Sequence, residues 1–141
     1  MKSRTAPAEQ IAALPIDRDD HGRLRVLMIT SRDTGRWVVP KGWPMKGRKP
    51  WQAAGIEALE EAGVEGDVGT EPLGTYTYDK ITEDGSALPC RVTVYPMRVA
   101  RLRKRWKERA ERERRWFKPK AAARRVDEPD LRDLIKALRR R

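Results

Sequence analysis

Apolar positions near the start of the chain fall into short runs that predict strands separated by polar turns. An apolar run spans 10–16, the polar turn DRDDHG follows, and 23–31 is rich in branched apolar residues. This pattern favours two strands joined by a hairpin, the second of them well buried. Residues 31–36 predict a loop, and 36–40 predict a short strand that Pro40 ends, because proline cannot donate to a sheet ladder.

A second pair of strands is expected in the middle of the chain. The segments 67–81 and 89–102 flank the turn sequence EDGSA, and RVTVY within the second segment alternates with a period of two residues. This alternation places Tyr95 on the face opposite Val92 and Val94. The two segments therefore predict a hairpin.

The end of the sequence is expected to be helical. Residues 103–115 are highly charged and predict a loop or an exposed helix, while 116–119 predict an extended segment. The stretch 120–140 predicts one or two helices. Asp127 or Asp130 is the expected N-cap, because a short carboxylate accepts hydrogen bonds from the first helical turn.

One helix stands at the centre of the predicted fold. It follows a loop rich in glycine and proline, Pro50 suits its first turn, and Gly63 suits a left-handed cap. Ala54, Ala58 and Ala62 recur at helical spacing and predict a small-residue face that docks on a sheet. Strands combined with one central and one terminal helix predict a layered domain of the mixed α+β class.

Composition narrows the class of protein. The chain has 141 residues, enough for one core, so a single domain over 1–141 is expected. It has neither a run of about 18 apolar residues nor the apolar core of a secretion signal, which predicts a cytoplasmic protein without a membrane partner. Cys90 is the only cysteine, which excludes an internal disulfide or a thiolate metal site within one chain. The oligomeric state is left open.

The net charge of +11 is concentrated toward one end of the sequence. Residues 98–141 hold 19 lysines and arginines against 7 acidic residues, whereas 67–97 hold 2 against 5. Such a surface attracts polyanions, including nucleic acid, anionic membranes and small phosphorylated substrates. Charge by itself does not choose among them.

Three glutamates, Glu57, Glu60 and Glu61, lie three and four residues apart on the central helix. This spacing stacks them on one face, where like charges repel by roughly a few tenths of a kcal/mol per pair. Carboxylates beside the carbonyls of a glycine-rich loop form an oxygen site suited to magnesium or manganese, which relieves the repulsion. A solvated acidic helix face is the alternative that the spacing alone leaves open.

The stretch 42–64 resembles the Nudix box. The family pattern is Gly, five residues, Glu, seven residues, then Arg-Glu-apolar-x-Glu-Glu-x-Gly-apolar. The positions that match it in register are Gly42, Glu57, Ala58, Glu60, Glu61, Gly63 and Val64. Two positions depart, with Arg48 in place of the first Glu and Ile56 in place of the Arg. The flanking segments SRDTGRWVVPKGWPM, EEAGVEG and RRWFKPKAAARRV are similar to the diphosphoinositol polyphosphate phosphohydrolase branch of the family.

The resemblance implies a fold, a reaction and a cofactor. The fold is a Nudix-like α/β/α sandwich with a mixed β-sheet, a central catalytic helix and a C-terminal helix. The reaction is hydrolysis of a diphosphate linkage joined to another group, with Mg²⁺, or alternatively Mn²⁺, as cofactor. Glu57, Glu60 and Glu61 are the implied catalytic residues and, together with Gly42 through its carbonyl, the implied metal ligands. Both Glu57 and Glu60 are candidates for the proton acceptor.

A small, highly phosphorylated substrate is also implied, either a diphosphoinositol polyphosphate or a dinucleoside polyphosphate. The arginine side chain suits such a substrate because its fork pairs with phosphate oxygens. The resemblance implies substrate binding by Ser31, Arg32, Arg36, Arg91 and Arg114. Lys41 adds phosphate affinity because it lies in the loop beside the metal site. For each arginine, a solvated surface position is the alternative.

Two alternatives remain. Arg48 and Ile56 favour a catalytically weakened Nudix domain that binds polyphosphorylated ligands or RNA, whereas the intact glutamates oppose it. The basic stretch 101–115 is typical of nonspecific nucleic-acid binding. Glutamates interspersed in that stretch form pairs with its arginines, which argues against a nucleic-acid partner.

Overall fold

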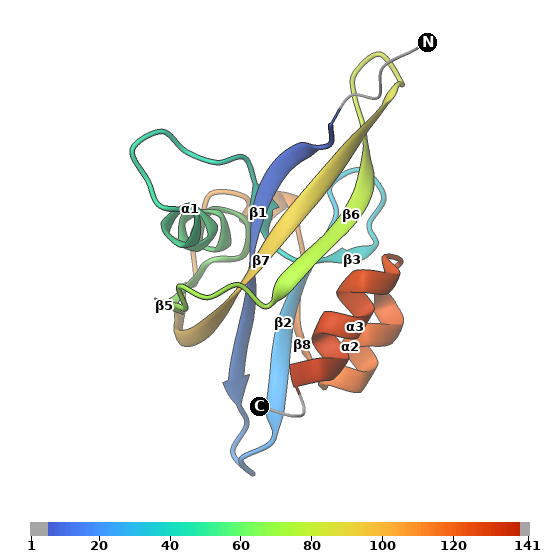
Figure 1. The fold of residues 1–141 in the computed structure, drawn as a ribbon. Coiled ribbons are helices and arrows are strands. Elements are labelled where there is room, and N and C mark those ends of the chain that lie inside the picture. Colours follow the sequence, from blue (N-terminus) through green and yellow to red (C-terminus); the bar gives the residue numbers. More distant parts are fainter. Residues whose placement is uncertain (1–5, 139–141) are drawn as a thin grey trace.

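A mixed β-sheet with helices on both faces forms the body of the molecule (Figure 1). The computed structural model describes residues 6–138. Its strands are β1 (Ala8–Arg18), β2 (Leu24–Thr30), β3 (Trp37–Val38), β4 (Lys41–Gly42), β5 (Val64–Val68), β6 (Gly74–Ile81), β7 (Ala87–Leu102) and β8 (Arg114–Phe117). Its helical segments are α1 (Pro50–Glu57), η1 (Ala58–Ala62), η2 (Arg109–Glu111), α2 (Pro119–Arg125) and α3 (Pro129–Ala137). No helix among these residues has the length and apolar character needed to cross a membrane.

The centre of the sheet is a parallel pair, β1 and β7. Their register runs from Ala8 beside Cys90 to Ile16 beside Arg98. The strand order is β3-β2-β1-β7-β5, with β6 also on β7, β4 on β1 and β8 on β2. Every one of these pairs other than β1 with β7 is antiparallel. A parallel pair needs a long crossover between its strands, and the chain between β1 and β7 contains α1.

Both faces of the sheet are buried, because its central strands alternate between two helical layers. On β1, Ile11 and Ala13 belong to the core cluster that includes the alanines of α1 and η1. Ala12 and Leu14 belong to the cluster that includes the apolar residues of α2 and α3 on the other face (Figure 1). This arrangement confirms the predicted α+β sandwich with a mixed sheet, and the C-terminal helical layer is a pair of helices.

Small residues bring α1 and η1 close to the sheet. Ala53, Ala54, Ala58 and Ala62 are fully buried, which confirms the predicted alanine face. The helical stretch ends at Gly63, whose φ of 66° lies in the left-handed region that glycine adopts without strain. Its last five residues, the η1 segment, form a π-helical turn, a widened geometry that the sequence did not indicate.

The predicted hairpins and the short strand β3 are confirmed. Strands β4 and β5 are additions to the prediction, and β4 lies where the loop rich in glycine and proline was expected. For residues 103–115 a loop or an exposed helix was expected. Residues 103–113 form a loop that contains the 3₁₀ turn η2, whereas Arg114 and Arg115 begin strand β8. The expected caps Asp127 and Asp130 are wrong. Glu128 is the N-cap of α3, because Pro129 lacks an N–H and therefore suits the first helical position.

Candidate active site

A cavity of about 280 Å³ lies beside the end of α1. Glu57 and Glu61 line it from the helical side, and Lys41 and Gly42 line it from β4. The other lining residues are Gln10, Ser31, Arg32, Asp33, Val38, Trp43, Tyr78, Lys80, Glu108 and Arg112. The cavity therefore contains carboxylates, which suit a cation. It also contains ammonium and guanidinium groups, which suit an anion.

Gly42 makes room for Glu57 in this cavity. A β-carbon built at position 42 would collide with the Glu57 carboxyl group. The backbone there is tied to the sheet, because Gly42 pairs with Ile11 in the register of β4 and β1. Only glycine therefore allows this close approach of strand and glutamate.

Glu57 lines the cavity without a neutralising partner among the described residues. Within residues 6–138, no ion pair or side-chain hydrogen bond to Glu57 occurs. Burial, followed by the negative charges of Glu61, Glu60 and Glu108, raises the pKa of Glu57 to about 7. Such a carboxylate gains stability by binding a proton or a cation near neutral pH.

Glu61 is held by two contacts, whereas Glu60 points elsewhere. The backbone N–H of Lys41 donates to Glu61 Oε1 at 3.2 Å, and Arg112 Nη2 lies 3.5 Å from Glu61 Oε2. Burial raises the pKa of Glu61, while Arg112 and the Lys41 N–H oppose that shift. Glu60 pairs with Lys107 at 3.7 Å and does not line the cavity. The structure therefore brings together two of the three predicted glutamates.

The segment 103–114 covers the end of the π-helical turn. The carbonyls of 60–62 accept hydrogen bonds from the Glu108 backbone N–H at 3.1 Å, the Trp106 indole N–H at 3.1 Å and the Arg114 guanidinium at 2.9 Å. These bonds satisfy carbonyls that the end of a helix leaves without a partner. They also fix the segment that brings Glu108 and Arg112 to the cavity.

Three of the residues predicted to bind substrate do line the cavity: Ser31, Arg32 and Lys41. Arg32 is half-exposed and lies 3.8 Å from the Glu108 carboxylate. Lys41 Nζ lies 4.9 Å from the centre of the Tyr78 ring. Within residues 6–138 this ammonium has no ion pair or hydrogen bond, and burial lowers the pKa of Lys41. A partly buried cation of this kind suits an anionic ligand.

The other three predicted substrate-binding residues lie outside the cavity lining. Arg36 pairs with Glu128 at 3.1 Å, and Arg91 pairs with Glu9 at 2.8 Å. Arg114 donates to carbonyls at the helix end and lies over the Trp106 ring, 3.9 Å from its centre. The structure gives each of these arginines a protein partner.

Sequence reasoning missed Glu108, Arg112, Tyr78 and Lys80 as cavity residues. Glu108 and Arg112 are four residues apart, and this spacing did predict that they pair, which they do at 2.8 Å. Nothing in the sequence indicated that the pair faces the cavity, because the segment is an irregular loop held by single hydrogen bonds.

Residues 8–138 match the family model described as the NUDIX domain. The chain belongs to the Nudix family. Among its relatives, Nudix hydrolase 12, mitochondrial, from Arabidopsis thaliana is 35% identical over 71% of this chain and 51% of its own length. The human diphosphoinositol polyphosphate phosphohydrolase 3-beta is 35% identical over 66% of this chain and 54% of its own length. This Nudix chain thus spans about half the length of these named relatives.

Solved structures share the Nudix fold. The C. elegans Ap4A hydrolase superimposes with a TM-score of 0.63 at 16% identity, over 94% of this chain and 96% of that one. The NUDIX domain of Shewanella oneidensis NrtR, complexed with ADP ribose, gives a TM-score of 0.69 at 17% identity, over 97% of this chain and 89% of that one. At this level of identity the likeness concerns the fold.

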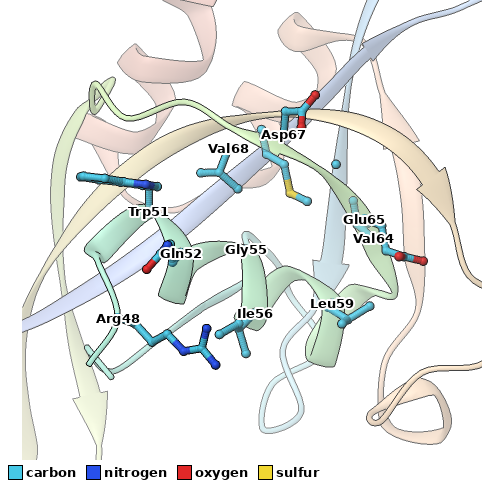
Figure 2. A pocket seen from close by; sticks show the side chains of 12 residues that line it. Arg48, Trp51, Gln52, Gly55, Ile56, Leu59, Val64, Glu65, Asp67 and Val68 are labelled. Carbon is cyan, nitrogen blue, oxygen red and sulfur yellow. The ribbon is translucent and has the colours of Figure 1, made fainter. Parts of the chain in front are cut away.

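The two positions that depart from the Nudix box line a second cavity. Arg48 and Ile56, together with Trp51 and Leu59, line a cavity of about 530 Å³. Figure 2 shows their side chains beside α1. Neither Arg48 nor Ile56 lines the cavity that holds Glu57. The two substituted positions therefore change the surroundings of α1 but add no side chain to the cavity that Glu57 and Glu61 line.

The donor set of the Nudix box fits a divalent cation. Nudix hydrolases generally use metals such as Mg²⁺. Within residues 6–138, no three His, Cys, Asp or Glu side chains gather as a ligand group. Magnesium, however, commonly binds through one or two carboxylates together with substrate phosphates. Glu57, which has no polar partner, and Glu61 supply two such carboxylates in one cavity beside Gly42.

Proposed function

We propose that the chain is a Mg²⁺-dependent Nudix pyrophosphohydrolase that cleaves a diphosphate linkage in a highly phosphorylated small molecule. A diphosphoinositol polyphosphate and a dinucleoside polyphosphate are the two substrate classes. One observation carries the proposal: the partly buried Lys41 ammonium, which has no polar partner within residues 6–138, lines the same cavity as the Glu57 carboxylate. This combination of charges supports a site that binds a cation and a phosphate chain side by side.

In this proposal Glu57, Glu61 and the Gly42 carbonyl hold Mg²⁺, or Mn²⁺ in its place. When bound, the ion neutralises phosphate charge and makes water a stronger nucleophile at neutral pH. Glu60 is the third ligand of the predicted set, and it reaches the site only by leaving Lys107. Glu57 is preferred over Glu60 as the proton acceptor, because Glu57 lines the cavity and Glu60 does not.

The phosphates of the substrate bind to Ser31, Arg32 and Lys41 in this proposal, together with Lys80. Lysine and arginine cations stabilise charge on a phosphate chain, and a half-buried site strengthens that effect. Arg36, Arg91 and Arg114 are not part of the proposed substrate site, because they lie outside the lining of the cavity. A cytoplasmic location and the absence of a nucleic-acid partner stay predictions.

The second candidate is a Nudix domain that binds polyphosphorylated ligands without cleaving them. Arg48 and Ile56 are the observation that favours it, because two charged positions of the box are altered. Their position in the second cavity weakens this alternative. Tight ligand binding without metal and without turnover is its signature.

The experiment is phosphate release by the purified chain with Mg²⁺ from a panel of substrates. The panel contains a diphosphoinositol polyphosphate, diadenosine polyphosphates of several lengths, nucleoside triphosphates and a nucleotide sugar, each also tested with Glu61→Gln. Turnover of the most phosphorylated members that the variant loses supports the proposal. No turnover of any member, combined with ligand binding by both proteins, supports the binding module.

A further inference from the structure

Arg112 contacts two carboxylates of the cavity at once. Its Nε donates to Glu108 at 2.8 Å, and its Nη2 lies 3.5 Å from Glu61. The remaining nitrogen, Nη1, donates to the carbonyl of Thr30 at 3.0 Å. All three nitrogens of the guanidinium therefore have a protein oxygen as partner.

This use of the guanidinium distinguishes Arg112 from the other cations of the cavity. The Arg112 side chain is 8% exposed, whereas that of Arg32 is 54% exposed. Lys41 directs its ammonium to an aromatic ring and has no polar partner within residues 6–138. Arg112 is thus committed to protein oxygens, while Lys41 is free to bind an anion.

The contacts of Arg112 also tie three separate segments together. Thr30 ends β2, Glu61 belongs to the π-helical turn, and Glu108 lies in the loop 103–113. A planar guanidinium fixes such partners in direction as well as distance, which an ammonium does not. Among the ion pairs of residues 6–138, the one with Arg112 is the only pair that Glu61 makes.

We propose that Arg112 is the positioning residue of this Nudix site, which holds the Glu61 carboxylate in the orientation that binds a divalent cation. The inference rests on the proposed function, since it assigns Glu61 as a metal ligand. Groups that orient a ligating carboxylate typically change metal affinity or activity by about 10–100-fold when they are removed.

The first test is the affinity for Mn²⁺, measured by titration calorimetry without substrate. The proteins are the wild-type chain, Arg112→Met, Arg112→Lys and Arg109→Met. Arg109 is the matched control, because it lies in the same loop, stacks over Trp106 and lines no part of the cavity. We expect Mn²⁺ to bind about 10–100-fold more weakly to Arg112→Met, with an intermediate loss in Arg112→Lys and no change in the control.

The direction in which Mn²⁺ affinity changes in Arg112→Met distinguishes a positioning role of Arg112 from an effect of its charge alone. Arg112→Met removes a positive charge beside Glu61, so charge alone predicts tighter Mn²⁺ binding. Tighter or unchanged binding in Arg112→Met overturns the proposal. If Arg112→Met does not fold, Arg112→Lys decides, because it keeps the charge and loses the planar fork. Wild-type affinity in Arg112→Lys then overturns the proposal.

The second test uses the best substrate of the panel. A positioning role predicts that Arg112→Met lowers kcat by about 10–100-fold while KM changes little. A raised KM with unchanged kcat overturns the proposal, since it identifies a substrate contact. A wild-type chain that binds Mn²⁺ but turns over no substrate contradicts the proposed function, and the calorimetric result still decides the role of Arg112.

Discussion

Gly42 lies so close to Glu57 that a β-carbon at position 42 would collide with the Glu57 carboxyl group. We therefore expect Gly42→Ala to push Glu57 out of its place, to lower the free energy of unfolding by about 1–3 kcal/mol and to abolish most of the turnover. Thermal unfolding and phosphate release measure the two effects.

A double-mutant cycle isolates this contact. Glu57→Ala removes the carboxyl group with which the new methyl would collide. We expect Gly42→Ala to cost much less stability in the Glu57→Ala background than in the wild-type chain. Equal costs in the two backgrounds would show that Gly42 is needed for some reason other than Glu57.

The raised pKa of Glu57 predicts how stability changes with pH when no metal is present. The pKa rises from 4.5 in the unfolded chain to about 7, so the folded state binds the proton more tightly. Its contribution to stability is thus full below pH 4.5 and is lost as the pH rises through about 7. We expect Glu57→Gln to raise the free energy of unfolding by about 1 kcal/mol at pH 8, because solvent screens part of the repulsion at the half-buried Glu57.

Chemical denaturation in EDTA at pH 4 and pH 8 measures this effect. The stabilisation by Glu57→Gln is expected at pH 8 and absent at pH 4. Magnesium at pH 8 is expected to stabilise the wild-type chain more than the variant, because the ion offsets the repulsion among the carboxylates. A variant that is less stable than the wild type at pH 8 in EDTA contradicts this description of Glu57.

Replacing Arg114 tests whether this side chain stabilises the end of the helix or contacts the substrate. Its guanidinium donates to the carbonyls of Ala62, Gly63 and Arg103. We expect Arg114→Met to lower the free energy of unfolding by about 2–4 kcal/mol, because hydrogen bonds of charged donors are lost at a helix end. KM is expected to stay within a factor of two or three. A stable variant with a strongly raised KM would instead support the contact with substrate that the sequence indicated.

Lys41 is expected to act on substrate affinity. Lys41→Met removes the ammonium that faces the cavity, so KM should rise by about 10-fold or more while the fold stays intact. Arg98→Met is the matched control, because Arg98 is exposed on β7, pairs with Asp67 and lies outside the cavity. An equal rise in KM for both variants would mean that overall charge, and not the Lys41 contact, governs affinity.

The sequence predicts the central helix and its alanine face well, because both follow from local spacing. Ala54, Ala58 and Ala62 lie at helical intervals, and Gly63 provides the left-handed cap. The same spacing placed Glu57, Glu60 and Glu61 on one face. It did not predict the π-helical turn, which begins after Glu57 and contains Glu60 and Glu61. Glu57 and Glu61 line the cavity, whereas Glu60 pairs with Lys107.

The loop 103–113 shows where sequence reasoning stops. Its charge pattern predicted the pair of Glu108 and Arg112. Its position on the cavity depends on long-range contacts, such as the hydrogen bond from the Trp106 indole to the carbonyl of Glu61. Contacts of this kind leave no periodic signal in the sequence, and Arg112 was therefore seen only as part of a basic stretch.

The most direct measurement is Mg²⁺-dependent phosphate release from a diphosphoinositol polyphosphate by the wild-type chain, by the Glu57→Gln and Glu61→Gln variants and by Glu71→Gln. Glu71 is exposed and outside the cavity, so its variant controls for the loss of one negative charge. The account predicts turnover by the wild type and by Glu71→Gln that EDTA abolishes, and a rate lower by at least about 100-fold in each of the two cavity variants. Turnover that persists in Glu57→Gln and Glu61→Gln, or that does not depend on the metal, would contradict it.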